Sequence, residues 1–177
     1  DSAHPGAVEK ALRLYPGRAL LNSISGEKKK IEEILPVAAR YGTPFILLPV
    51  DDEGVPETWQ KRREVIRRVW KTARSRGFSR DDLIVDGLVM TVSSNPGAPR
   101  ETLETIRWST DIFRCRTLVG LSNVSFGLPE RKWLNGAFLA MAAARGARFV
   151  IANPAEQEVM ALAAAAGVHL SAHGGSG

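Results

Sequence analysis

The stretch Leu118-Val119-Gly120-Leu121-Ser122-Asn123-Val124-Ser125-Phe126-Gly127 joins an apolar run to a cluster of small polar residues. The apolar run predicts a buried strand, and Pro129 predicts the start of a helix soon after it. The expected apolar face of that helix consists of residues three, four and seven positions apart: Leu134, Ala137, Phe138 and Met141. An apolar strand that carries an Asn into the loop before a helix is how an α/β protein builds a site. The rest of the chain repeats this plan.

The composition is that of a soluble globular protein. The chain has 177 residues, of which 44% are hydrophobic and 24% charged, enough for one domain with a core. Its apolar runs are too short to span a membrane, and the chain opens on Asp1-Ser2 without a secretory signal pattern. The single cysteine, Cys115, excludes an internal disulfide framework and a zinc site with several cysteines. A reducing, cytoplasmic setting is therefore expected.

The net charge of +5 is concentrated in the segment 61–76. Such a basic segment indicates either an anionic partner or the solvated outer face of a helix. The second interpretation is favoured, because a core stripe lies between the charges: Ile66, Val69, Trp70 and Ala73. No exposed strand carries the interleaved aromatic residues that single-strand binders use, so no nucleic-acid partner is expected.

Five predicted strands alternate with helices: 18–25, 44–51, 83–90, 118–125 and 148–154. Each strand ends or bends at a polar residue, and these residues follow one another 29 to 37 residues apart: Asn22, Asp51, Asp86, Asn123 and Asn153. That spacing is the size of one βα unit, which predicts parallel strands of a (β/α) barrel. No Gly-x-Gly-x-x-Gly follows any strand, so a dinucleotide-binding fold has no support.

The strand count is too low for a closed barrel, which needs eight strands and typically about 250 residues. Asp1 looks like the last residue of a further strand whose body is absent. Residues 1–170 are therefore expected to form the C-terminal part of a barrel, and residues 171–177 a flexible tail or linker. Because open strand edges are exposed, we expect the first strands to come from the rest of a parent chain. A homodimer is a second way to cover exposed surface.

Polar strand ends converge on one face of a parallel barrel. Here they carry only Asp and Asn, which argues against a Ser-His-Asp or Cys-His nucleophile system and against a metal site. Carboxylates and amides are suited to hydrogen-bonding the edge of a flat heterocycle. The alternative interpretation is that each of these residues closes a turn or caps the next helix.

Several motifs resemble the pterin-binding methyltransferase family, whose members include the methyltetrahydrofolate domain of cobalamin-dependent methionine synthase and the methyltetrahydrofolate:corrinoid/iron–sulfur protein methyltransferase. The motifs are Leu21-Asn22-Ser23-Ile24-Ser25, Val85-Asp86-Gly87-Leu88-Val89, Gly120 through Arg131, and Asn135-Gly136-Ala137-Phe138-Leu139-Ala140-Met141. The resemblance covers Asp1 to about Asn153 and implies a (β/α)₈ TIM barrel. It makes the five strands the fourth to the eighth of that barrel. Two departures are Gly87, where many relatives have Pro, and Pro49, where relatives often have Thr.

The resemblance also implies a site. Three residues would hydrogen-bond the pterin ring: Asp1, Asn22 and Asp86. Asn123 would reach toward N5 of the pterin, so Asn123 and Asp86 are the expected catalytic residues. Gly120 and Ser122 would line the pocket. Arg131 would lie near the outer end of the substrate, and no resident metal is implied.

The implied reaction moves the N5 methyl group of 5-methyltetrahydrofolate to the cobalt(I) of a cobalamin or corrinoid carried by a partner protein or domain. One alternative is an enzyme similar to dihydropteroate synthase. That family places a Lys on the seventh strand and a Ser-x-Arg near the barrel's end, where this chain has Ser122-Asn123 and Asn153-Pro154. A second alternative is a barrel fragment that binds folate without catalysis.

Overall fold

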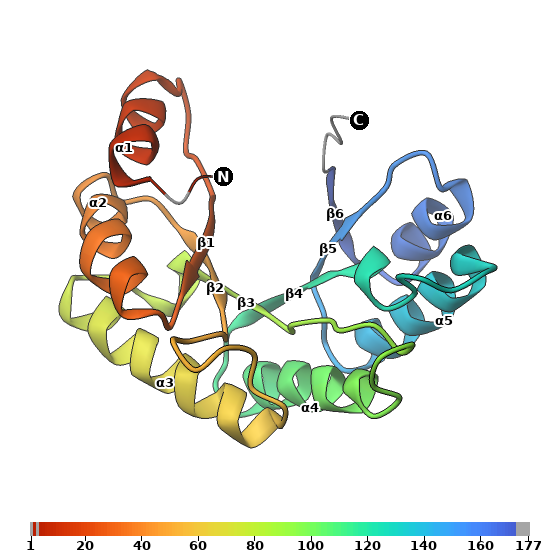
Figure 1. Cartoon of the computed structure of the whole chain (residues 1–177). Helices are drawn as coiled ribbons and strands as arrows, with labels where there is room; N and C mark the ends of the chain where they lie inside the picture. Colours follow the sequence, from red (N-terminus) through yellow and green to blue (C-terminus); the bar gives the residue numbers. More distant parts are fainter. Residues whose placement is uncertain (1, 3, 173–177) are drawn as a thin grey trace. The chain divides into compact units, whose positions relative to one another are not determined.

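Residue 2 and residues 4–172 are described in a computed structural model of the chain (Figure 1). The predicted site residue Asp1 and the last part of the predicted tail, residues 173–177, lie outside the described residues. The chain divides into two compact units, Asp1–Val85 and Asp86–Gly177, and each is described by itself. Among the described residues, no helix has the length and apolar character needed to cross a lipid bilayer.

Helices alternate with short parallel strands in the first unit. In chain order the elements are α1 (Pro5–Leu14), β1 (Leu21–Ser25), a π-helical turn (Lys30–Ile34), α2 (Leu35–Arg40), β2 (Phe45–Leu48), α3 (Trp59–Ser75), a 3₁₀ turn (Arg80–Asp82) and β3 (Leu83–Asp86). Strand β2 lies between β1 and β3 and runs parallel to both. Figure 1 shows α2 and α3 along one side of these strands.

The strands of the first unit are buried on both faces, as parallel strands covered by helices require. Consecutive residues of β2, from Phe45 to Leu47, are all buried. Three of the four residues of the predicted α3 stripe, Ile66, Val69 and Ala73, have no exposed surface, whereas the fourth, Trp70, is only half-buried. Pro49 directly follows the last residue of β2, the strand-end position expected for a residue without a ladder donor.

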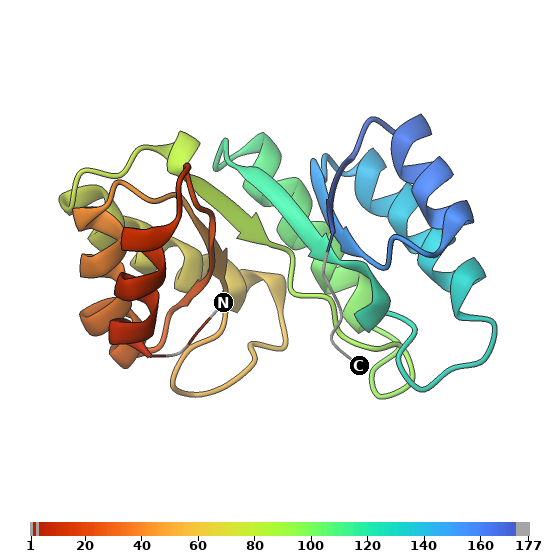
Figure 2. The ribbon, with the colours of Figure 1, turned by 90° about the horizontal axis from the view of Figure 1, so that it is seen from above.

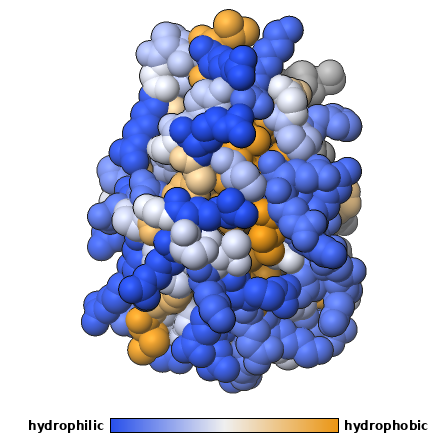
Figure 3. Space-filling view, turned by 90° about the vertical axis from the view of Figure 1, so that its left-hand side faces the viewer, coloured by the Kyte–Doolittle hydropathy of each residue, from blue (hydrophilic) through white to orange (hydrophobic). Residues whose placement is uncertain are grey.

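The outer side of the first unit is mainly polar. Figure 3 shows this side as a largely hydrophilic surface, with smaller hydrophobic areas along its middle and at its upper and lower edges. The exposed residues of α3 include Lys61, Arg67, Lys71 and Arg74. The basic segment thus has the amphipathic arrangement of a helix with one solvated face.

The second unit continues the same alternation. Its elements are α4 (Ala98–Asp111), β4 (Arg116–Gly120), a 3₁₀ turn (Leu121–Asn123), α5 (Arg131–Ala144), β5 (Phe149–Ala152), α6 (Gln157–Ala165) and β6 (His169–Ala172). Strand β5 lies between β4 and β6 and is parallel to both. Helices α5 and α6 lie side by side in both ribbon views (Figures 1 and 2). The core includes Val119, Leu121, Leu139 and Val150.

The inner face of α5 differs from the predicted one. Its buried residues are Asn135, Phe138, Leu139 and Ala142, whereas the predicted Leu134 and Met141 are 38% and 52% exposed. The predicted face was therefore wrong by one residue, except at Phe138. The physical reason is Asn135, a polar residue that can be buried because its amide is hydrogen-bonded on both sides.

The C-terminal boundary also differs from the prediction. Residues 169–172 form β6, which pairs with β5, so Ser171 and Ala172 belong to a strand and not to a tail. Residues 169–172 form a strand because their backbone pairs with the edge of β5. The segment is too short for an apolar periodicity to predict that strand.

Candidate functional site

The predicted site residues are divided between the two units. Asn22 lies on β1 in the first unit, half-buried, where the register with β2 shifts between Asn22 and Ile24. The second unit contains the other described members of the predicted set: Asp86, Gly120, Ser122, Asn123 and Arg131. Most of the described residues of the predicted site therefore lie in the second unit.

The turn after β4 presents Asn123. Strand β4 ends at Gly120, earlier than the predicted end at Ser125, and the chain then enters the 3₁₀ turn. The turn is closed by the backbone, since the Val124 N–H donates to the Leu121 carbonyl at 3.2 Å. Leu121 and Val124 point into the core, with 1% and 2% of their surface exposed. With its apolar neighbours anchored, the turn leaves Asn123 exposed at the carboxyl end of the strand.

The Asn123 side chain is not used to hold this turn. Within the described part of the chain, its amide group makes no hydrogen bond, although an amide can both donate and accept. The Asn123 amide can lie against residue 120 because that residue is glycine: a Cβ atom at position 120 would lie 3.2 Å from Asn123 Nδ2, closer than ordinary contact. The arrangement can offer a donor and an acceptor to a ligand at the strand end.

Asp86 is the last residue of β3 and is half-buried. Its Oδ1 accepts the N–H of Leu88 at 2.8 Å, which closes the turn after β3. The adjoining Gly87 donates its N–H to the Leu118 carbonyl at 2.9 Å, a bond that Pro could not make. A Cβ at position 87 would also lie 3.0 Å from Ile106 Cγ1, closer than ordinary contact, so a larger residue here would require α4 side chains to shift.

The loop after β3 and the loop after β4 are joined by hydrogen bonds. Thr91 Oγ1 and Ser93 Oγ donate to the Phe126 carbonyl at 2.7 and 3.2 Å. The Val92 N–H donates to the Val124 carbonyl at 3.0 Å. These residues were not predicted from the sequence, and no periodic pattern marks them. The bonds connect the loop that follows Asp86 to the loop that contains Asn123.

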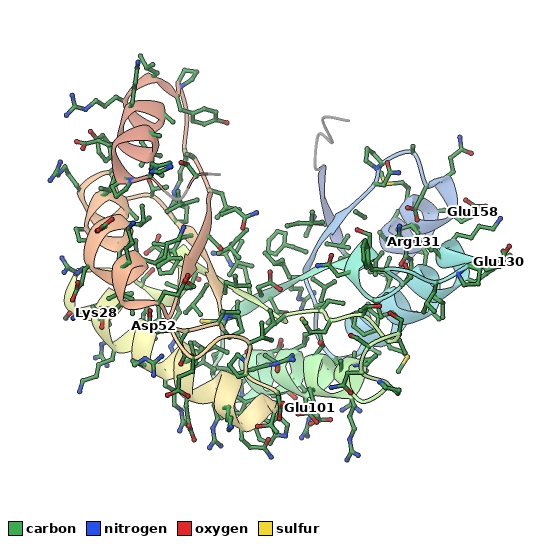
Figure 4. All side chains as sticks on the ribbon, viewed as in Figure 1. Lys28, Asp52, Glu101, Glu130, Arg131 and Glu158 are labelled. Atoms are coloured by element: carbon green, nitrogen blue, oxygen red, sulfur yellow. The ribbon has the colours of Figure 1, made fainter. Side chains whose placement is uncertain are left out.

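Arg131 holds the turn from its other side. Its Nη2 donates to the Ser122 carbonyl at 2.7 Å, and its Nε donates to Ser125 Oγ at 3.0 Å. Figure 4 shows Arg131 at the start of α5, beside this turn. The guanidinium group therefore supports the backbone that presents Asn123.

Other strand-end residues close turns, as the alternative interpretation expects. Asn153 Oδ1 accepts the Ala155 N–H at 3.0 Å. Asp51 Oδ1 accepts the Glu53 N–H at 3.1 Å, and its Oδ2 accepts Arg68 Nη2 at 2.7 Å. For Asn153 and Asp51, the interpretation that the side chain closes a turn is confirmed.

One ion pair joins the start of α5 to the start of α6. Lys132 Nζ lies 3.4 Å from Glu158 Oε1. A hydrogen bond from the backbone N–H of Glu158 itself, followed by Lys132, lowers the pKa of the Glu158 carboxyl below its usual value. In the described part of the chain, no group of three or more His, Cys, Asp or Glu side chains could hold a metal ion.

A sequence profile described as pterin binding enzyme matches residues 1–153. The chain belongs to the pterin-binding enzyme family. This membership confirms the family that the sequence motifs predicted.

Two curated relatives indicate which pterin-binding enzymes are similar. Methylcorrinoid:tetrahydrofolate methyltransferase of Eubacterium limosum is 26% identical over 163 residues, which are 90% of this chain and 60% of that protein. Methionine synthase of Mycobacterium tuberculosis is 28% identical over 155 residues, which are 78% of this chain and 13% of that protein. The chain thus spans about 60% of the first relative and a small part of the second.

A solved structure shows the fold of this pterin-binding enzyme. Dihydropteroate synthase from Stenotrophomonas maltophilia superposes with a TM-score of 0.66 at 21% identity, covering 90% of this chain and 64% of that chain. The parallel βα units are therefore part of a pterin-binding (β/α)₈ TIM barrel, as predicted. At this identity the likeness concerns the fold alone.

Proposed function

We propose that the chain is the folate-binding part of a methyltransferase. The reaction moves the N5 methyl group of 5-methyltetrahydrofolate to the cobalt(I) of a corrinoid carried by a partner protein or domain. The names of the Eubacterium limosum and Mycobacterium tuberculosis relatives support this choice within the family. The first of these names gives the reverse direction of the same exchange. The observation that carries the proposal is the exposed amide of Asn123, which the turn after β4 does not use.

The chemistry explains why that amide matters. The bond from N5 to the methyl carbon breaks, a cobalt–carbon bond forms, and N5 keeps the electron pair. A tertiary amine is a poor leaving group, so a hydrogen bond that strengthens as N5 gains negative character lowers the barrier. The corrinoid supplies cobalt(I) as the nucleophile. The Asn123 N–H donates to N5, and water supplies the proton.

The remaining predicted residues hold the substrate. Asp1, Asn22 and Asp86 hydrogen-bond the pterin ring, and Gly120 and Ser122 line the same pocket. Asp86 has a carboxylate at the end of β3 that already accepts one backbone N–H, which fixes its orientation. Arg131, expected near the outer end of the substrate, also holds the turn through Ser122 and Ser125.

Further βα units complete the barrel in this proposal. Strand β1 pairs with β2, and no strand covers its other edge among the described residues. An apolar groove of about 380 Å³ beside β1 is lined by Val8, Leu12 and Leu21. The chain covers 60% and 64% of two longer pterin-binding relatives, so N-terminal barrel strands are suitable occupants.

A homodimer is the second proposed association. Large apolar side chains are exposed on α5: Trp133 at 64%, Leu134 at 38% and Met141 at 52%. Large apolar side chains exposed on one helix favour an interaction site there. Sedimentation analysis of the full-length protein at several concentrations tests this association.

The proposed function is tested with the full-length protein. Anaerobic spectrophotometry with cob(I)alamin and 5-methyltetrahydrofolate should show conversion to methylcobalamin. Folate binding without conversion would support a non-catalytic folate-binding part. Formation of dihydropteroate from a pterin diphosphate and p-aminobenzoate would support the dihydropteroate synthase alternative. Absence of folate binding would contradict both the methyltransferase and the non-catalytic folate-binding part.

A further inference from the structure

A buried chain of hydrogen bonds starts at the turn that presents Asn123. Ser125 and Asn135 are 0% and 1% exposed, and Ser125 Oγ lies 2.7 Å from Asn135 Oδ1. Asn135 Nδ2 in turn donates to Glu156 Oε2 at 3.2 Å. We propose that Asn135 and Glu156 are positioning residues, which set the place of the Asn123 amide through Ser125. This role rests on the proposed function of Asn123.

The direction of each bond in this chain is fixed. The Ser125 hydroxyl has one proton, and Asn135 Oδ1 at 2.7 Å is a closer acceptor than the Ser122 carbonyl at 3.4 Å. Ser125 Oγ in turn accepts the N–H of Arg131 Nε at 3.0 Å. The Glu156 carboxylate accepts the N–H of Asn135 Nδ2 and ends this series of hydrogen bonds. The Arg131 guanidinium at one end and the Glu156 carboxylate at the other strengthen the neutral hydrogen bond between Ser125 and Asn135.

The chain of bonds acts on the position of Asn123 because that residue lies between two held points. Ser122 is held through its carbonyl by Arg131, and Ser125 is held through its hydroxyl by Asn135. Leu121, directly before this segment, and Val124, within it, are buried in the core, and the Val124 carbonyl also accepts the Val92 N–H at 3.0 Å. When Asn135 loses its Glu156 acceptor, its side chain is free to rotate and release Ser125, so the turn can shift and move the Asn123 amide away from the reacting nitrogen. A displacement of about 1 Å can lower a rate by roughly 100-fold.

Glu156 connects this turn to the next strand end. It lies in the loop between β5 and α6, and its N–H donates to the Asn153 carbonyl at 3.1 Å. The loop after β5 therefore supports the loop after β4, although its own Asn153 side chain closes a local turn. This explains why a polar Asn135 occupies the inner face of α5.

The test uses Glu156, which is only half-buried, so that its variants can be expected to fold. Glu156→Ala in the full-length protein should lower the single-turnover rate of methyl transfer about 10-fold or more. The dissociation constant for 5-methyltetrahydrofolate should stay within about two-fold of the wild type. Glu156→Gln should retain the rate, because its amide oxygen can still accept from Asn135. Glu156→Asp, one methylene shorter, should fall between the two.

The matched control is Lys132→Ala. Lys132 pairs with Glu158, so it connects α5 to α6 as Asn135 connects α5 to Glu156, but it does not reach the turn. This variant should transfer methyl groups at the wild-type rate. An equal loss in Lys132→Ala and Glu156→Ala would overturn the positioning role, since both would then act through general loosening of the helix pair.

A double-mutant cycle gives the second readout. In the Asn123→Ala background, Glu156→Ala should cause no further loss of rate, because its effect passes through the missing amide. Additive losses would overturn the proposal.

The closing experiment does not depend on activity. In ¹⁵N-labelled protein, Glu156→Ala should shift the side-chain amide signal of Asn123, whereas Lys132→Ala should not. An unshifted Asn123 signal in Glu156→Ala would contradict the positioning role. If the signal shifts but the wild type transfers no methyl group, the positioning role stands and the proposed function fails.

Discussion

The turns after β4 and β5 each place an Asn at the end of a parallel strand, and they use it differently. Asn153 Oδ1 accepts the Ala155 N–H and so closes its own turn. The turn after β4 is closed by its backbone and by Arg131, and the Asn123 amide takes no part in it. The comparison shows that a polar strand end becomes a candidate ligand contact when other groups hold its turn.

Asp86 is an intermediate case, and it gives the largest predicted effect on folate binding. Its Oδ1 closes a turn, yet it is also proposed to bind the pterin ring. Asp86→Asn should keep an acceptor for the Leu88 N–H but lose the charge-assisted bonds to the ring, weakening folate binding roughly 10-fold to 100-fold. Isothermal titration with 5-methyltetrahydrofolate measures this. Unchanged affinity in a folded Asp86→Asn protein would place Asp86 with Asn153, as a residue that only closes a turn.

Gly120→Ala tests the space around Asn123. The added methyl group would lie 3.2 Å from Asn123 Nδ2, closer than ordinary contact, and should displace the amide. Methyl transfer should fall about 10-fold, since a small misplacement suffices. Single-turnover kinetics measure the loss.

Gly136→Ala is the matched control for that change. A Cβ at position 136 would meet Leu162 Cδ2 at an ordinary 3.6 Å, and the residue lies inside α5. It should leave the rate unchanged and stabilise the helix by about 0.5–1 kcal/mol. A similar rate loss in both variants would show that the space around Asn123 is not special.

Asn153→Ala should have the smallest effect on the reaction. It removes one turn bond, to the Ala155 N–H, and should cost about 1 kcal/mol of unfolding free energy. Methyl transfer should remain within about two-fold of the wild type. Urea unfolding together with the transfer assay checks both values. A large loss of transfer in this variant would remove the distinction between the two turns.

Local patterns were enough to predict the βα alternation and one helix face. The core stripe of α3 follows directly from apolar residues spaced three and four apart, and the structure buries Ile66, Val69 and Ala73 as expected. Pro49 at the end of β2 follows from its missing N–H. Both predictions depend on neighbours in sequence and on backbone chemistry alone.

The inner face of α5 could not be predicted in the same way. Asn135 is buried because Ser125 and Glu156, 10 and 21 residues away, satisfy its amide. A hydropathy pattern contains no information about such partners, so the sequence favoured Leu134 and Met141. The same limit applies to β6, which is ordered by pairing with β5.

The strand-end residues show the corresponding limit for the site. Sequence position identified Asn123 and Asn153 alike, because both follow apolar strands. Their difference depends on which backbone groups each turn leaves for the side chain to satisfy. That is a property of the folded turn.

The most direct measurement is the single-turnover rate of methylcobalamin formation by the Asn123→Ala variant of the full-length protein. If the Asn123 amide stabilises N5 in the transition state, the rate falls roughly 100-fold or more. The affinity for 5-methyltetrahydrofolate should then change only a few-fold. A variant that transfers the methyl group at the wild-type rate would contradict the role assigned to the turn after β4.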